Sequence, residues 1–158
     1  MGNIFAASEI VELGIQIEKN GQDFYLALSK KAKDLKAQEI FRYLAGEEEK
    51  HIKVFQEILG SMEKYAPADV YSGEYYAYMN ALASEHIFTQ ENKGEEIAKK
   101  AKTDKEAVSL GMGLEQDSIV FYEGMKQTVE AGGHKAIDEL IRQEQNHFRQ
   151  LFNLREKL

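Results

Sequence analysis

Apolar residues recur every three or four positions along four long segments of this 158-residue chain, and this periodicity constrains its fold more than any other feature. Such spacing places the apolar side chains on one face of an α-helix. The chain has only one proline and 12 glycines, so few turn or strand signals interrupt the pattern. The sequence therefore predicts an all-α protein in which four helices bury their apolar faces against one another.

Residues that commonly cap or end helices predict where these four helices begin and stop. Ser8 and Asp34 are expected N-caps, and Thr103 with Glu106 forms a capping box. The pair of glycines at 132 and 133 is expected to end the third helix. The predicted helices span about residues 8–32, 35–62, 104–131 and 135–157, and residues 63–103 form a crossover.

The crossover is too long for a turn, and we expect it to contain helix of its own. Two helical hairpins joined by one long crossover make the ferritin-like form of the four-helix bundle, whereas an up-and-down bundle uses short connections throughout. We therefore expect a single ferritin-like domain over residues 1–158. The crossover contains the tyrosine-rich stretch EYYAYMNAL, for which three roles remain open: a cap on the bundle, a shield for a site, or a dimer face.

Six polar residues interrupt the apolar faces of the four predicted helices. The first and third helices each carry one glutamate, with residues no larger than serine one turn away on both sides. The second and fourth helices each carry a glutamate followed three residues later by a histidine, a spacing that keeps both on one helical face. The six residues are Glu18, Glu48, His51, Glu115, Glu144 and His147.

The two halves of the chain resemble each other. The stretch GIQIEKNGQDFY, from Gly14, aligns with GMGLEQDSIVFY, from Gly111, at a constant offset of 97. Glu48 aligns with Glu144 at an offset of 96, so one residue has been lost in the hairpin between the two stretches. A duplicated pair of hairpins predicts a pseudo-twofold site where the halves meet.

Carboxylates in the core of a bundle need a compensating positive charge. Burying one unpaired carboxylate costs several kcal/mol, whereas a whole domain has a net stability of about 5–15 kcal/mol. Two divalent metal ions would balance four carboxylates, and carboxylate with imidazole ligands favours iron or manganese over structural zinc. Each feature alone has an ordinary explanation, such as a solvated charged face, but their shared register on four helices favours a two-metal site.

Composition excludes several other classes of protein. The chain has 27 acidic and 20 basic residues, a formal charge of -7 and no dense basic patch, so nucleic acid is not an expected partner. It has no cysteine, which excludes disulfides, zinc ribbons and thiolate-ligated iron. No apolar stretch approaches the roughly 18 residues of a membrane span, and the start, MGNIFAASEI, lacks the features of a secretion signal. We expect no membrane association and a cytoplasmic location.

The combined pattern resembles that of the ferritin-like di-iron carboxylate proteins, and among them the rubrerythrins most closely. The resemblance rests on Glu18 with Tyr25 seven residues later, Glu115 with Tyr122 seven residues later, and the two Glu-x-x-His pairs. It extends over nearly the whole chain. The resemblance implies a cofactor of two iron ions, for which manganese or zinc are the expected substitutes.

The same resemblance implies a role for each polar residue. Each iron would have one terminal carboxylate and one histidine, and both irons would share two bridging carboxylates. Glu18 and Glu115 are the implied terminal ligands, Glu48 and Glu144 the bridges, and His51 and His147 the histidines. Tyr25 and Tyr122 are expected near the metals, as hydrogen-bond partners of ligand carboxylates or as one-electron donors, and we favour the first role.

Two features depart from the rubrerythrin pattern. Rubrerythrins typically append an iron domain held by four cysteines that delivers electrons, whereas this chain has no cysteine and needs another electron donor, such as a rubredoxin-like protein. Ser118 lies where rubrerythrins commonly carry a further glutamate that is linked to redox-dependent ligand exchange. Because that glutamate is missing, the resemblance gives weaker support for peroxide reductase activity in this protein. Glu85 and His86, in the crossover, are not expected to bind metal.

The leading hypothesis is a di-iron oxidoreductase that reduces hydrogen peroxide or dioxygen with electrons from an external donor, as a homodimer. One alternative is a non-catalytic iron-binding protein, or one that oxidises and stores iron as ferritins do. A third is a structural bundle whose polar layer only fixes the helix register. Bound metal would exclude the third, and repeated turnover would separate the first from the second.

Overall fold

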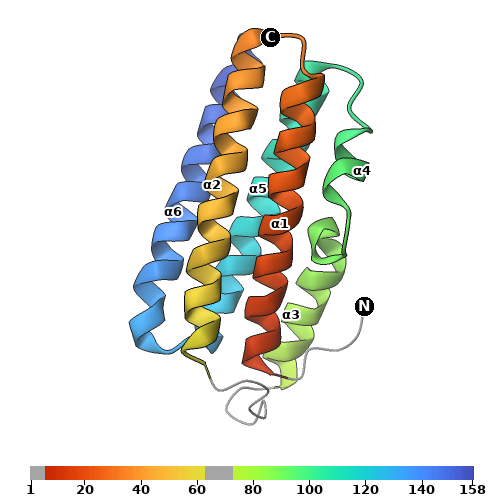
Figure 1. Ribbon diagram of the computed structural model, residues 1–158. Coiled ribbons are helices and arrows are strands. Elements are labelled where there is room, and N and C mark those ends of the chain that lie inside the picture. The colour runs from red at the N-terminus through yellow and green to blue at the C-terminus, as the bar shows by residue number, and fades with distance from the viewer. Residues whose placement is uncertain (1–5, 63–72) are drawn as a thin grey trace.

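The computed structural model describes residues 6–62 and 73–158 (Figure 1). Four long helices form the bundle: α1 (Ala7–Lys31), α2 (Leu35–Gly60), α5 (Asp104–Met125) and α6 (Ala131–Glu156). The described part of the crossover contains α3 (Gly73–Glu85), a 3₁₀ turn (Ile87–Thr89) and α4 (Gly94–Ala98). The first ten residues of the predicted crossover, 63–72, lie outside the described residues. The predicted pair of hairpins with helix in the crossover is therefore observed.

Two of the predicted helix caps are confirmed. The carboxylate of Asp34 accepts a hydrogen bond from the Ala37 amide at 2.9 Å, which satisfies one of the free N–H groups at the start of α2. Thr103 caps α5 by accepting from the Glu106 amide at 3.1 Å. The Glu106 carboxylate accepts from the amide of Lys102, at 2.7 Å, one residue earlier than in an ideal capping box.

The start of α1 and the end of the third long helix differ from the prediction. The N-cap of α1 is Ala6, which makes no side-chain cap bond, and Ser8 lies within the first turn. The helix predicted over 104–131 ends at Met125 and continues as a 3₁₀ turn only to Thr128. The prediction was wrong there because the two glycines belong to the beginning of α6.

The glycine at position 133 has a packing role rather than a helix-ending one. A Cβ atom at this position would lie 2.2 Å from Cγ1 of Val129, so only glycine allows the chain to turn so closely. His134 supports the same turn, since its Nε2 lies 2.7 Å from the Val129 carbonyl oxygen. A glycine pair thus ends a helix only where the backbone adopts the left-handed conformation typical of helix C-termini.

The two hairpin connections explain the change of offset in the repeat. In the first hairpin, residues 32–34 separate α1 from α2. In the second, only residues 129 and 130 separate the 3₁₀ turn from α6. The second connection is one residue shorter, which accounts for the fall of the offset from 97 to 96.

The crossover packs against the first helix of each hairpin. In Figure 1, α4 runs beside α1, and α3 lies below α4. Helix α3 packs on α5. The hydroxyl of Tyr75 donates to the Gly124 carbonyl oxygen at 2.6 Å, and a Cβ at position 124 would lie 2.5 Å from the sulfur of Met79. Tyr76 is buried and Tyr78 is half exposed, so the tyrosines of α3 mainly cover the bundle.

A single buried side chain, Asn20 on α1, joins α1 to the segment between the 3₁₀ turn and α4. Its amide nitrogen donates to the carbonyl oxygens of Phe88 and Gln90, at 2.8 and 2.5 Å. Its oxygen accepts from the amides of Lys93 and Gly94, at 3.0 and 3.2 Å. Asn20 therefore satisfies four backbone groups that no helix or strand would satisfy.

Within the two described ranges, none of the helices has the length and apolar character needed to cross a membrane.

Candidate metal centre

The six predicted ligand residues lie together in the middle of the bundle, and all are at most 4% exposed. Each long helix contributes because its polar residues occupy positions of the buried apolar face. Helix α1 carries Glu18, α2 carries Glu48 and His51, α5 carries Glu115, and α6 carries Glu144 and His147. The polar layer is therefore built from all four helices and both hairpins.

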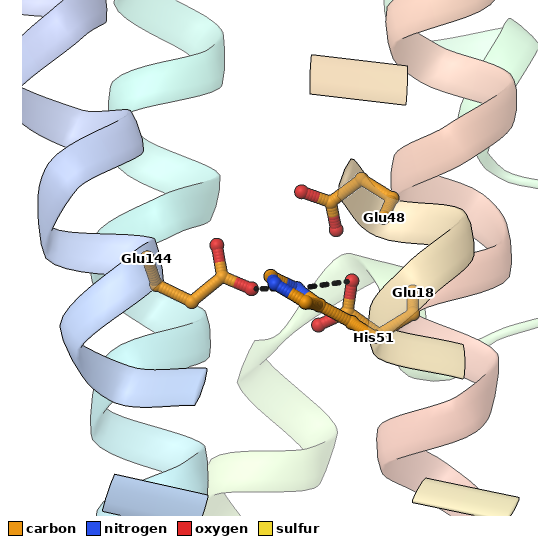
Figure 2. A group of neighbouring side chains, drawn as sticks. All are labelled: Glu18, Glu48, His51 and Glu144. Atoms are coloured by element: carbon orange, nitrogen blue, oxygen red, sulfur yellow. Dashed lines mark ion pairs between the residues drawn. The ribbon is translucent and has the colours of Figure 1, made fainter. Parts of the chain in front are cut away.

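The first group of four converging side chains is shown in Figure 2. It contains Glu18, Glu48, His51 and Glu144, and one ligand atom from each lies within 4.8 Å of the others. Nδ1 of His51 lies 2.9 Å from Oε1 of Glu144 and 3.5 Å from Oε2 of Glu18. In Figure 2, Glu144 reaches from α6 toward His51, while Glu18 lies on the opposite side of the ring.

A second group overlaps the first. It contains Glu48, Glu115, Glu144 and His147, again with one atom from each within 4.8 Å of the others. Nδ1 of His147 lies 3.1 Å from Oε2 of Glu144, 3.7 Å from Oε1 of Glu48 and 3.8 Å from Oε1 of Glu115. Glu48 and Glu144 belong to both groups, so each can offer a different oxygen to two neighbouring positions.

The hydrogen bonding of these atoms fits a cation at the first group. Among the described residues, four buried side-chain atoms have no hydrogen-bond partner: Oε2 of Glu18, Oε1 of Glu48, Nδ1 of His51 and Oε1 of Glu144. All four belong to the first group. A buried polar atom without a partner costs about 1–3 kcal/mol. Although Nδ1 of His51 and Oε1 of Glu144 are close, they are not aligned as donor and acceptor, and both are free to bind a metal ion between them.

The carboxyl groups cannot all be ionised without a cation. Burial raises the pKa of Glu48, Glu115 and Glu144, and neighbouring carboxylates raise it further. Burial would raise the pKa of Glu18 as well, but the adjacent His51 lowers it to about 2. In the protein without metal, the site therefore retains protons that divalent ions would displace.

The two histidines differ in their charge state. Burial lowers the pKa of His51, but Glu18 and Glu144 raise it to about 12, so this ring is an imidazolium without metal. Burial lowers the pKa of His147, and this effect prevails over the attraction of Glu115. The Glu18 and His51 pair is thus charged, whereas the Glu115 and His147 pair is neutral.

Each buried tyrosine donates a hydrogen bond to a glutamate of the other hairpin. The Tyr25 hydroxyl donates to Oε1 of Glu115 at 2.6 Å, and the Tyr122 hydroxyl donates to Oε1 of Glu18 at 2.5 Å. Burial and then the neighbouring glutamates raise the pKa of both tyrosines well above the usual value, so both remain protonated donors. The tyrosines therefore orient the carboxylates and leave Oε2 of Glu18 free.

Small residues make room for the polar layer, as the sequence pattern predicted. A Cβ at position 21 would lie 3.0 Å from Oε2 of Glu48. A Cβ at position 111 would lie 3.3 Å from the Tyr25 hydroxyl and 3.2 Å from Leu151. Glycine at these two positions thus lets the glutamate and tyrosine side chains cross the bundle.

His86 is a buried neighbour of the site that belongs to neither group of ligands. It is 2% exposed, and its Nδ1 accepts a hydrogen bond from the Phe88 amide at 3.2 Å. Nε2 therefore carries the proton and donates to Oγ of Ser118 at 3.0 Å. Ser118 in turn donates to the Leu114 carbonyl oxygen at 2.9 Å, while Glu85 is exposed. The sequence did not indicate this contact of His86 with Ser118.

The fold and the site together define a ferritin-like helical bundle with a buried carboxylate and histidine cluster. A crystal structure from Thermotoga maritima, whose protein is described as ferritin-like and diiron-carboxylate, has the same fold with a TM-score of 0.71. The two sequences are 21% identical, and the match covers 99% of this chain and 97% of the other. The predicted all-α, ferritin-like architecture is confirmed.

Residues 9–155 match the sequence model of the Rubrerythrin family, so the chain belongs to the rubrerythrin family. Comparison with curated protein sequences gives no significant match. The family assignment made from the glutamate, tyrosine and histidine spacing is confirmed.

Proposed function

We propose that this protein is a di-iron oxidoreductase of rubrerythrin type, which reduces hydrogen peroxide or dioxygen with electrons from an external donor. The observation that carries the proposal is the pair of overlapping groups that share Glu48 and Glu144. Oxygen and imidazole ligands suit iron or manganese, and zinc is a substitute that such ligands also accept. Membership of the rubrerythrin family supports iron as the metal.

Under this proposal each metal position has its own ligands and two shared ones. Glu18 and His51 would serve the first position, and Glu115 and His147 the second. Glu48 and Glu144 would bridge both positions, because each lies in both groups. Four carboxylates and two divalent ions give a site with no net charge, which removes most of the cost of burying the glutamates.

A reduced iron pair supplies two electrons at one place, and hydrogen peroxide with two electrons and two protons gives two molecules of water. The residues of the chain restrict what can react there. A cavity of about 10 Å³ lies beside Gly21, Glu48, Glu115 and Ser118, and this is room for about one water-sized molecule. Apolar side chains such as Phe24 and Ile17 line the same cavity. A small oxidant fits this space better than an organic substrate.

Under this proposal the electrons come from outside these 158 residues. The sequence has no cysteine to hold the iron domain that rubrerythrins typically append. A soluble rubredoxin-like protein is therefore the proposed donor, the homodimer the proposed assembly, and the cytoplasm the proposed location.

Iron oxidation and retention is the second candidate, and Ser118 favours it. The hydroxyl of Ser118 is already bonded to His86 and to the Leu114 carbonyl oxygen, so no further carboxylate is available on this side of the site. The site then resembles a symmetric ferritin-like centre more than the less symmetric rubrerythrin one. Ser118→Glu should raise peroxide turnover if the missing acid limits the rate, provided that His86 can move away.

Iron analysis followed by a redox titration tests the proposal. Protein purified from its own host should contain about two iron ions per chain, as the two ligand groups require. After anaerobic reduction, stoichiometric peroxide should reoxidise the iron rapidly, and repeated cycles with a rubredoxin-like donor should continue without loss of iron. Dioxygen consumption with growing iron content would instead support storage, and protein without metal would leave only the structural interpretation.

A further inference from the structure

A chain of side-chain hydrogen bonds leads from the surface of α6 to the outer nitrogen of His51. Nε2 of His51 and Oε1 of Gln143 lie 2.8 Å apart. The amide nitrogen of Gln143 donates to Oε1 of Glu139 at 2.9 Å. Arg142 donates to both oxygens of the same carboxylate, at 2.5 and 2.6 Å. The half-buried Gln143 thus connects an exposed ion pair with a buried histidine.

The chemistry of these groups gives each hydrogen bond a direction. A carboxylate only accepts, so Gln143 must present its NH₂ group to Glu139 and its carbonyl oxygen to His51. An amide oxygen also only accepts, so Nε2 of His51 carries a proton. When a metal ion displaces the second proton of the imidazolium, the neutral ring therefore has its lone pair on Nδ1. That atom faces Glu144 at 2.9 Å and Glu18 at 3.5 Å.

We propose that Gln143 is a positioning residue, which holds His51 in the tautomer and ring orientation that direct Nδ1 into the first metal position. The proposed function assigns no role to Gln143, although this inference rests on the two-metal site described there. Outer hydrogen bonds of this kind hold the ring orientation of the ligand histidine before the metal arrives and keep the proton on the outer nitrogen when it binds, so less ordering is needed.

The internal repeat does not copy this arrangement in the other half. At the offset of 96, Gln143 corresponds to Glu47 and Glu139 corresponds to Tyr43. The Glu47 carboxylate pairs with Lys50 at 2.7 Å. The ring of Tyr43 packs edge-on against His147, with 6.5 Å between ring centroids. The two ligand histidines therefore have different outer partners, and Gln143 acts on one metal position only.

Zinc titration tests this role with a metal that has no redox chemistry. Metal-free wild-type protein should take up two zinc ions per chain in two steps, measured by competition with a chromophoric chelator. Gln143→Met keeps the side-chain length but removes the acceptor, and it should weaken one step by about 10- to 100-fold while leaving the other unchanged. Gln143→Glu restores an acceptor and should restore that step.

Spectra of ¹⁵N-histidine-labelled protein identify the affected ring. In the zinc-loaded wild type, His51 should show a protonated, slowly exchanging Nε2 and a zinc-bound Nδ1. Gln143→Met should lose the slow exchange at Nε2, whereas Glu47→Gln, the matched change in the other half, should leave both the His51 signals and its binding step unchanged. Thermal unfolding of the metal-free variants should give the wild-type midpoint, because Gln143 is only half buried.

Two results would overturn the proposal while leaving the metal site intact. One is two zinc ions bound with unchanged affinity in Gln143→Met. The other is Gln143→Glu binding as weakly as Gln143→Met, which would mean that Gln143 packs but does not act as an acceptor. Wild-type protein that binds fewer than two zinc ions would instead remove the two-metal site itself, and the role of Gln143 with it.

Discussion

The α1–α2 hairpin and the α5–α6 hairpin present the same ligands at matching places but surround them differently. Asn20 on α1 binds the crossover, whereas Asp117, its counterpart at the offset of 97, is exposed on α5. Gln143 supports His51, whereas Tyr43 packs on His147. The inward faces of the two hairpins repeat because both must supply the same polar layer. The difference between Asn20 and Asp117 follows from the crossover, which packs on α1 through α4 and on α5 through α3.

The largest expected effect is removal of a terminal glutamate from either hairpin. Glu18→Ala and Glu115→Ala should each reduce the metal content from two ions to about one. The affinity for the lost ion should fall by more than the roughly 10- to 100-fold that outer partners contribute, because a direct ligand is missing. Metal analysis after gel filtration measures both variants.

Glu49→Ala is the control for this pair, since Glu49 is an exposed acid next to Glu48 and points away from the site. It should retain the full metal content. Full metal content in Glu115→Ala would contradict the assignment of Glu115 as a ligand, and the same result in Glu18→Ala would contradict that of Glu18.

The second comparison concerns stability. Asn20→Ala should lower the free energy of unfolding by about 4 kcal/mol, because four backbone groups lose their partner at about 1 kcal/mol for each bond. Asp117→Ala changes the matching exposed residue and should stay within about 0.5 kcal/mol of wild type. Urea unfolding of metal-free protein measures both, and equal effects would show that the crossover does not depend on Asn20.

The third comparison uses pH and the metal-free protein. The pKa of Glu48, Glu115 and Glu144 is raised in the folded state, so these groups keep protons that the unfolded chain releases above pH 4.5. The free energy of unfolding should therefore fall as pH rises from about 5 to 8, by up to about 1.4 kcal/mol per pH unit for each such group. His51 acts in the same direction above pH 6.5, because its folded pKa is raised to about 12.

Glutamine substitutions separate the two hairpins in this experiment. Glu115→Gln should flatten the pH dependence, because it removes one of the retained protons. Glu18→Gln removes no retained proton of its own, because the pKa of Glu18 is lowered to about 2, so between about pH 5 and 6.5 it should flatten the dependence less than Glu115→Gln does. Denaturant midpoints at several pH values provide the measurement, and equal flattening by both variants would disprove the difference in charge between the halves.

The smallest expected effect is loss of a tyrosine hydroxyl. Tyr25→Phe and Tyr122→Phe should each weaken metal binding by roughly tenfold, since each removes one hydrogen bond to a ligand carboxylate. The two effects should be similar because the bonds are nearly equal, at 2.6 and 2.5 Å. Chelator competition measures them, and a large difference between the variants would show that the tyrosines are not equivalent.

The sequence alone determined the helical architecture and the members of the polar layer. Periodicity decides which residues of a helix face the core, and this is a local property of the chain. The caps at Asp34 and Thr103 were predictable for the same reason, because each bonds to a backbone group three residues away. The glycines at 132 and 133 misled the prediction because their role depends on the contact of residue 133 with Val129.

Only the tertiary structure decided which side chains meet across helices. Tyr25 could have bonded to a glutamate of its own hairpin, yet it bonds to Glu115. The contacts of His86 with Ser118 and of Gln143 with His51 join residues 32 and 92 positions apart. Helical periodicity gives the direction of a side chain from its own axis, but the distance to another helix depends on how the helices pack, and this is a property of the whole bundle.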